Sequence, residues 1–418
     1  MQAEIGYGKQ KIGITIPNSK QCKIFEPKRV EKMTDFGSKF KQSLLYPFSS
    51  KPINELVEPS KKFVIVVDDI SRPIPTQEIL VPLLDVLVAN KIPLSNVQVI
   101  VATGVHRPLH DDELNFILGR YAKLISIENH NPDDLSNLIS IGKTSIGNEI
   151  KINRKFIETD LKIIIGDIEF HQFCGYGGGA KSIFPGLADR KSIERNHSRF
   201  TLKGADKGEW KNNPVRQEIE ELYEMTSNVF LINVILNEKN EIIKIFSGDL
   251  RKAYLEGLRT IDGLFKATTH QPFDLILSSP GGYPRDIDLY QSQKALQSAA
   301  KIGKKNGKIV IIAECSDGFG SDIFNRTVKN ANSLVEIIDN AQKEFVLGAH
   351  KAFQLARDIL DSDVYIYSSI SPKEIAYSFL KPITMEGIHK LIETSQSIAV
   401  LPYASTMHVS IVNDQNDS

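Results

Sequence analysis

Short runs of apolar residues recur in the first half of the chain, and each run ends at a polar, glycine-bearing or proline-bearing turn. Such nearly continuous runs are typical of strands that are covered on both faces of a parallel sheet. Segments with helical spacing lie between them, at 76–87 with Thr76 as the expected N-cap, and at 110–118 with Glu113 three positions after His110. The strand candidates are residues 63–67, 97–101 and 161–165. Strands that alternate with helices predict a doubly wound α/β architecture.

The same alternation starts again after Phe273, with a helical pattern at 290–302 and strand candidates at 275–279, 308–313, 364–367 and 398–401. The pattern is interrupted between residues 262 and 272. We therefore predict an α/β protein of two domains, each with a mainly parallel sheet flanked by helices. The expected division is an N-terminal catalytic and cofactor-binding domain at 1–265 and a C-terminal α/β domain at 270–418.

Composition narrows the class of protein further. The 51 basic residues balance the 51 acidic ones, so no overall field favours nucleic acid or an anionic membrane. The cysteines, Cys22, Cys174 and Cys315, are odd in number and far apart, which argues against a disulfide framework. No apolar run approaches the roughly 18 residues of a membrane span, and the N-terminus does not resemble a signal peptide. These features predict a cytoplasmic protein with neither a nucleic-acid nor a membrane partner.

Three polar clusters follow predicted strands, at 68–73, at 103–108 and from Glu169 onwards. Ligands of open α/β sheets bind beyond the carboxyl ends of the strands, where neighbouring clusters converge. Taken singly, each cluster has a structural explanation, since paired aspartates often cap a helix and His106 could lie in a surface turn. Three clusters in equivalent positions favour a binding site.

The densest signal is the glycine-rich segment 175–182, which ends in Lys181 and Ser182. It resembles a phosphate-binding P-loop, but Ala180 occupies the second glycine position and the preceding strand ends about nine residues too early. A nucleotide triphosphatase is therefore disfavoured. Consecutive glycines still let backbone N–H groups approach an anion, and a lysine there can pair with the anion or act as a nucleophile. His197, in Arg-Asn-His-Ser at 195–198, would by itself be interpreted as a histidine at a helix end.

Taken in order, these motifs resemble the nickel-dependent lactate racemase family. Asp-Asp-x-x-Arg-Pro stands at 68–73, Thr-Gly-x-His-Arg at 103–107, the long His-to-Gly motif at 171–186 and Asn-His-Ser at 196–198. Asn-Pro-Val-Arg at 213–216 and Tyr-Gln-Ser-Gln-Lys at 290–294 also resemble the family, so the resemblance spans roughly residues 60–300. Ala180, Gly178 and Cys174 depart from lactate racemase itself, which would suit a different substrate; Cys174 is either a small buried residue or a sulfur near nickel.

The resemblance implies a nickel-pincer nucleotide, a pyridinium mononucleotide whose nickel is held by carbon and sulfur. Lys181 would carry it through a thioamide, and His197 would be the protein's ligand to nickel, for which neutral imidazole is a suitable donor. Separate maturation enzymes would be partners, because they make the cofactor. Tyr290 could stack on the cofactor or be a core tyrosine. The remaining residues expected near the cofactor are Asp69, Gly177, Gly178, Gly179 and Ser182.

The implied reaction is racemisation or epimerisation of a 2-hydroxy acid. Removal of hydride from C2 gives a planar 2-keto acid that can receive hydride on either face. His106 and His171 match the family's pair of bases, and histidine accepts and returns protons near neutral pH. Arg72, Gln291 and Lys294 would orient the carboxylate and polarise the C2 oxygen, with the active site in the cleft between the domains. The alternatives are a non-catalytic nucleotide-binding or metal-binding homologue and a nicotinamide-dependent 2-hydroxy acid dehydrogenase.

Overall fold

The computed structural model describes residues 1–412, which form two compact units. One unit comprises residues 29–263, and the other joins residues 1–28 to the described residues from 264 onwards. The predicted N-terminal domain of residues 1–265 was therefore wrong at its start. The reason is strand pairing: β3 (Gln21–Ile24) adds to the edge of the second unit's sheet beside β19 (Ser397–Leu401).

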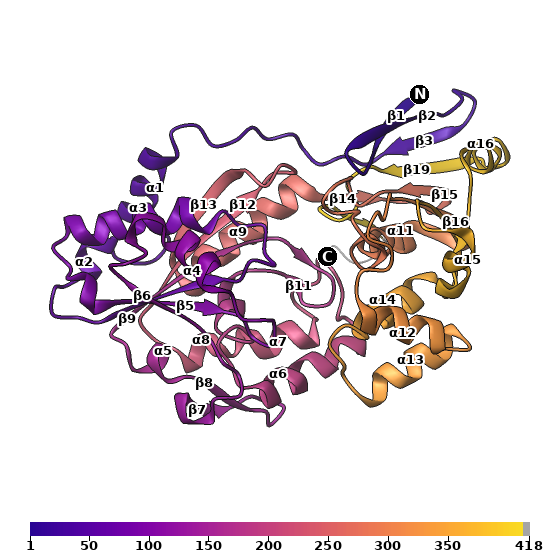
Figure 1. Cartoon of the computed structure of the whole chain (residues 1–418). Coiled ribbons are helices and arrows are strands. Elements are labelled where there is room, and N and C mark those ends of the chain that lie inside the picture. The colour runs from indigo at the N-terminus through magenta and orange to yellow at the C-terminus, as the bar shows by residue number, and fades with distance from the viewer. Residues whose placement is uncertain (413–418) are drawn as a thin grey trace. The chain divides into compact units, whose positions relative to one another are not determined.

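Among the described residues, the 29–263 unit contains a six-stranded sheet in the order β13-β12-β9-β4-β5-β6 (Figure 1). All neighbours are parallel except β12 and β13, which form an antiparallel pair. The strands are β4 (Phe63–Asp68), β5 (Val97–Ala102), β6 (Ser126–Asn129), β9 (Leu161–Asp167), β12 (Val229–Leu236) and β13 (Ile242–Asp249). The helices are α1 (Phe36–Leu45), α2 (Ile53–Leu56), α3 (Thr76–Ala89), α4 (Asp111–Leu118), α5 (Arg154–Glu158), α6 (Arg190–His197), α7 (Pro214–Glu220), α8 (Leu222–Met225) and α9 (Leu250–Phe265).

The apolar runs of this unit behave as predicted, because β4 and β9 are buried along almost their whole length. Phe63, Ile65 and Val67 of β4 point into a core that also takes one face of α3. That helix begins at Thr76, but its N-cap is Pro75 and no side chain caps it, so the predicted capping role of Thr76 was wrong. The capping box of His110 and Glu113 is present at α4.

The other unit has a parallel six-stranded sheet within the described residues, in the order β18-β17-β16-β15-β19-β3. Its further strands are β15 (Phe273–Ser278), β16 (Gly303–Ile312), β17 (Asp363–Tyr367) and β18 (Lys381–Pro382). Its helices are α10 (Leu289–Ser292), α11 (Leu296–Ile302), α12 (Asp322–Asn330), α13 (Leu334–Lys343), α14 (His350–Ile359), α15 (Pro372–Ile375) and α16 (Met385–Thr394). Smaller pairs in this unit are β1 (Gln2–Tyr7) with β2 (Gln10–Thr15) and β14 (Lys266–Thr269) with β20 (His408–Ile411). The pairs β7 (Leu138–Lys143) with β8 (Glu149–Asn153) and β10 (Phe170–His171) with β11 (Gly175–Tyr176) belong to the 29–263 unit.

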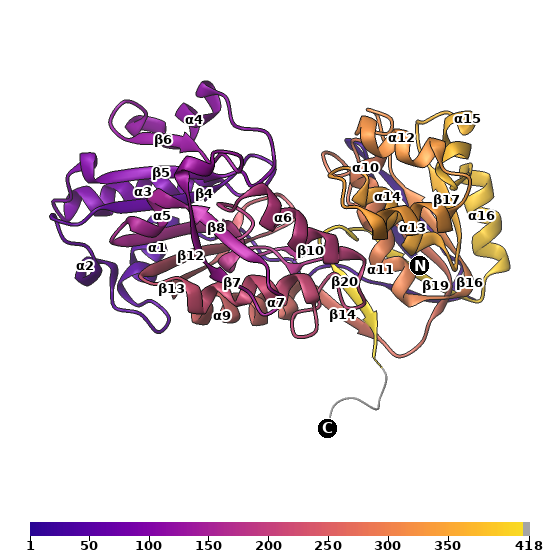
Figure 2. The ribbon, with the colours of Figure 1, turned by 90° about the horizontal axis from the view of Figure 1, so that it is seen from below.

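Successive side chains of β15 pack into different hydrophobic cores of this unit. Leu275 and Leu277 pack with the β1–β2 hairpin and α16, whereas Ile276 packs with α11 and α14. Figure 2 shows α16 on one face of this sheet and α11 and α14 on the other. The helix predicted at 290–302 is divided into α10, a 3-10 turn η6 (Gln293–Ala295) and α11. The Ser278 hydroxyl donates to the Ala295 carbonyl oxygen over 2.8 Å, which gives a backbone acceptor at this interruption a partner outside the helix.

Candidate active site

The three polar clusters meet at the carboxyl ends of β9, β4 and β5, which are neighbours in the sheet. The His106 Nδ1 atom lies 2.8 Å from a carboxylate oxygen of Asp69, which joins the cluster after β5 to that after β4. The Arg72 guanidinium donates to Glu169 over 3.0 Å, which joins the cluster after β4 to that after β9. The structure thus brings these residues together, as expected of clusters that follow neighbouring strands.

The Asp69–His106 pair has the geometry of an oriented general base. Asp69 is buried, and its second oxygen accepts the Ser71 backbone N–H over 2.7 Å. Burial raises the pKa of Asp69, but the hydrogen bond and charge of His106, together with the Ser71 hydrogen bond and the charge of Arg72, outweigh burial and hold the pKa at about 2. The ionised carboxylate therefore accepts Nδ1–H of His106, which leaves Nε2 of the neutral imidazole with a lone pair.

Two further carboxyl groups belong to the same end of the sheet. They are those of Asp68 and Asp167, the last residues of β4 and β9. Burial raises the pKa of Asp68 to about 6, although Arg72, Ser182 and Lys181 act in the opposite direction. Burial, followed by the charges of Glu169 and Asp68, raises the pKa of Asp167 well above its usual value. The Ser182 hydroxyl donates to Asp68 over 2.9 Å, so this predicted cofactor-binding residue is held against the end of β4.

The glycine-rich segment forms a tight loop between β11 and the 3-10 turn η4 (Gly179–Ser182), which carries Lys181. Gly178 has φ +75, and a Cβ there would lie 2.7 Å from the Asp167 carbonyl oxygen. The N–H of Gly177 donates to the Glu169 carbonyl over 2.8 Å, and that of Gly179 donates to the Asn233 side chain over 2.9 Å. These two N–H groups are therefore engaged within the protein, and either could hold a phosphate only by exchanging its present partner.

Lys181 sits in an environment that favours its neutral amine. Burial lowers the pKa of Lys181 to about 8; Arg72 and Arg216 add to this effect, whereas Cys174 and Glu169 oppose it. Cys174 is itself buried, as expected of a small filler, and is close enough to Lys181 to affect its charge. A neutral amine is the nucleophilic form of lysine.

His171 and His197 both pack against one aromatic ring. The Phe173 ring centroid is 4.7 Å from that of His171 and 5.3 Å from that of His197, with steep angles of 83° and 73° between the planes. The backbone N–H of Cys174 donates to Nδ1 of His171 over 3.2 Å, so neutral His171 carries its hydrogen on Nε2. The two predicted bases therefore present different groups in their neutral forms, a lone pair on His106 and an N–H on His171.

His197 is the last residue of α6, a helix that starts at Arg190 with Asp189 as its N-cap. Burial lowers the pKa of His197 to about 3, helped by the charges of Lys181, His106 and Arg72. Those interactions place His197 within electrostatic reach of three other predicted site residues. At neutral pH His197 is an uncharged imidazole, the form that binds a metal.

Tyr290, Gln291 and Lys294 belong to the other unit, on α10 and η6. The Asp288 side chain caps α10 by accepting the Gln291 N–H over 2.7 Å. The Tyr290 ring packs edge-on against Phe324, with centroids 5.7 Å apart, as a core tyrosine would. Its other neighbour is the Lys351 ammonium, 5.4 Å from the ring centroid.

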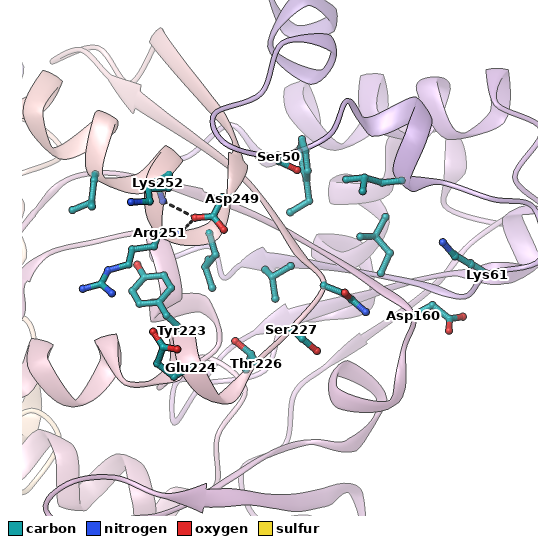
Figure 3. Close-up of a pocket in the computed structure, with 17 residues that line it drawn as sticks. Ser50, Lys61, Asp160, Tyr223, Glu224, Thr226, Ser227, Asp249, Arg251 and Lys252 are labelled. Atoms are coloured by element: carbon teal, nitrogen blue, oxygen red, sulfur yellow. Dashed lines mark hydrogen bonds between the residues drawn. The ribbon is translucent and has the colours of Figure 1, made fainter.

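A cavity of about 860 Å³ lies at the opposite end of the 29–263 sheet, beside the first residues of β9 and β12 (Figure 3). Its lining carries three cationic and three anionic side chains, so it has no excess charge to attract a charged ligand. Asp249 caps the start of α9 by accepting the N–H groups of Arg251 and Lys252 (Figure 3). The cavity lining includes none of the predicted site residues.

Within residues 1–412, no three His, Cys, Asp or Glu side chains come together as a set that could hold a metal ion. In the same part of the chain, no helix has both the length and the apolar character needed to cross a membrane.

Sequence reasoning missed Phe173, Asn196, Asn233 and Glu218 as parts of the site. Asn233 had a visible signal, since it is a polar residue inside the apolar strand β12. Asn196 belongs to the Asn-His-Ser motif at 196–198, but no role was predicted for it. Glu218 gave no signal, because a glutamate on a short helix is ordinarily exposed.

The fold and the site are those of an α/β enzyme with two units. The site contains three histidines, His106, His171 and His197, and a lysine on the glycine-rich segment. Residues 7–208 match the lactate racemase N-terminal domain family, and residues 268–401 match the lactate racemase C-terminal domain family. The lactate racemase of Thermoanaerobacterium thermosaccharolyticum is 30% identical over 96% of this chain and 97% of its own length. That of Lactiplantibacillus plantarum is 32% identical over 72% of this chain and 71% of its own.

The solved apoprotein of the Thermoanaerobacterium lactate racemase superposes with a TM-score of 0.87 at 28% identity, covering 98% of this chain and 100% of that one. A structure from Thermotoga maritima shares the fold, with a TM-score of 0.64 at 18% identity over 90% of this chain and 98% of that one. The chain belongs to the lactate racemase family. It is an isomerase, a racemase acting on a small molecule. This assignment takes the place of the two alternatives from the sequence, a dehydrogenase and a non-catalytic homologue.

Proposed function

We propose that this enzyme inverts C2 of a 2-hydroxy acid with a nickel-pincer nucleotide attached to Lys181, with His197 as the protein's ligand to nickel. The observation that supports this most is the pairing of an uncharged His197 with a lysine whose pKa is lowered to about 8, in one electrostatic neighbourhood. The donor set also fits, since the protein supplies one imidazole and the pincer would supply the remaining ligands. When bound, the group would accept hydride from C2 and return it.

The chain's own residues handle the protons and the carboxylate. His106, oriented by Asp69, would accept the hydroxyl proton of one enantiomer. His171 would serve the other with its lone pair on Nε2, which is the tautomer opposite to the one that the Cys174 N–H favours, so its hydrogen bond to Cys174 must be exchanged first. Arg72 remains charged throughout and is held in place by Glu169, so it is suited to orient the substrate carboxylate. Gln291 and Lys294 would assist with the carboxylate and the C2 oxygen, a role that rests on the family resemblance.

The test is intact-protein mass and nickel analysis of protein co-produced with the cofactor-maturation enzymes of the family. We expect a stable mass increase that disappears in Lys181→Ala and persists in Lys191→Ala, an exposed lysine on α6. We expect about one nickel per chain, lost in His197→Ala. Loaded protein should racemise at least one acid of a 2-hydroxy acid panel scored by chiral chromatography. Absence of both adduct and nickel from the wild type would refute the proposal.

A further inference from the structure

A buried chain of hydrogen bonds supports His197 from the side of its Nδ1 atom. The Asn196 side-chain oxygen lies 3.1 Å from Nδ1 of His197, and Asn196 is fully buried. Behind it, the Glu218 carboxylate is almost fully buried and accepts hydrogen bonds on both of its oxygens. These groups come from three segments, α6, α7 and the turn after β7, that converge at this point.

The orientation of the Asn196 amide is set by its other partners. Its nitrogen donates to Glu218 over 2.8 Å and to the Val215 carbonyl over 3.0 Å. Both partners can only accept, so the amide nitrogen must face them and the amide oxygen must face His197. Glu218 is fixed in turn, because the Thr144 hydroxyl donates to its other oxygen over 2.9 Å.

An amide oxygen can only accept, so Nδ1 of His197 must carry the hydrogen and Nε2 must carry the lone pair. We propose that Asn196 and Glu218 are positioning residues that hold His197 in this tautomer, whose lone pair on Nε2 is the one that would bind a metal. The metal is that of the proposed function, on which this inference rests. Outer partners of this kind fix the tautomer and ring orientation of a metal-binding histidine and raise its basicity, and their loss typically weakens metal affinity 10-fold to 100-fold.

The direct test needs no cofactor. Long-range ¹H–¹⁵N correlation spectra of the apoprotein, labelled with ¹⁵N-histidine, distinguish the two tautomers, and His197→Gln assigns the signals. We expect Nδ1–H in the wild type and a shift of population toward Nε2–H in Asn196→Leu. The matched control is Asn148→Leu, which removes another buried asparagine that donates to the Ser192 carbonyl.

An exchange of groups tests the network even if Asn196→Leu folds poorly. Asn196→Asp alone places a second carboxylate against Glu218 and should disturb the site. Adding Glu218→Gln restores a donor for that carboxylate and keeps an acceptor for Thr144, but it leaves the Val215 carbonyl facing a carboxylate oxygen. The double variant should therefore recover the Nδ1–H tautomer in part. A folded double variant, checked by circular dichroism, that recovers none of it relative to Asn196→Asp would contradict the network.

The second readout is nickel retention in loaded protein challenged with a chelator. Asn196→Leu should keep the mass increase at Lys181 while its apparent nickel affinity falls 10-fold to 100-fold. A wild-type His197 in the Nε2–H tautomer, or an Asn196→Leu protein with wild-type tautomer and retention, would overturn the inference. A wild type that never acquires adduct or nickel would instead refute the proposed function, while the apoprotein spectra would still decide the tautomer.

Discussion

Arg216 offers a sharp test of how the glycine loop is supported. Its guanidinium is fully buried, pairs with Glu220 over 2.6 Å and lies 4.9 and 4.6 Å from the ring centroids of Trp210 and Tyr254. It also reaches the Gly178 carbonyl over 3.4 Å. Arg216→Met retains much of the apolar volume but leaves the Glu220 carboxylate buried without its cation. Breaking a buried pair in this way costs about 3–5 kcal/mol.

The assay is urea unfolding followed by fluorescence of Trp210, the chain's sole tryptophan, which reports on the 29–263 unit. With a slope of about 2–3 kcal/mol per molar urea, the loss lowers the midpoint by about 1–2 M. Burial already raises the pKa of Glu220, and loss of Arg216 raises it further. The folded variant then loses stability as pH rises through that pKa, so the deficit should be larger at pH 8 than at pH 5.

Two controls isolate the cause. Arg154 and Glu158 form the same i,i+4 pair on a helix but are 42% and 57% exposed, so Arg154→Met should change stability by less than about 0.5 kcal/mol. Arg216→Met combined with Glu220→Leu should recover most of the loss, because no charge is left buried alone. A wild-type midpoint for Arg216→Met, or a double variant no better than the single, would refute the reasoning.

Three further outcomes test the site itself. Gly178→Ala should lower both stability and cofactor loading, because its Cβ would meet the Asp167 carbonyl at 2.7 Å; intact mass and urea unfolding measure these effects. Asp69→Asn should reduce kcat about 100-fold or more with little change in fold, because the amide no longer fixes the His106 tautomer; wild-type turnover would contradict this. In the apoprotein, trace acetylation of Lys181 should be half-maximal near pH 8, and a midpoint near 10 would show an ordinary lysine.

The fold was largely readable from the sequence because its main signals are local. The apolar runs at 63–67 and 161–165 are strands, since each is long and apolar enough to be covered on both faces. What could not be read depends on distant pairing. Nothing in residues 21–24 indicates that they add to a sheet whose next strand starts at Ser397. The interruption of the helix at 293–295 likewise involves a distant residue, Ser278 at the end of β15.

The site, like the fold, was predictable from the sequence only in part. The convergence of the clusters containing Asp69, His106 and Glu169 was predicted on the condition that their strands are neighbours, and β9, β4 and β5 meet that condition. The tautomers of His106 and His171 could not be predicted from the sequence, because they depend on which backbone or side-chain group reaches each ring. His106 meets a carboxylate, whereas His171 meets a backbone N–H. No pattern of residue types along the chain contains that difference.

The electrostatics of the site would change when the proposed cofactor is attached. The charge of Lys181 now lowers the pKa values of both Asp68 and His197. Conversion of its amine into a thioamide removes that charge, so both pKa values should rise. Asp68 would then be more fully protonated at neutral pH, which limits the negative charge left beneath the loop.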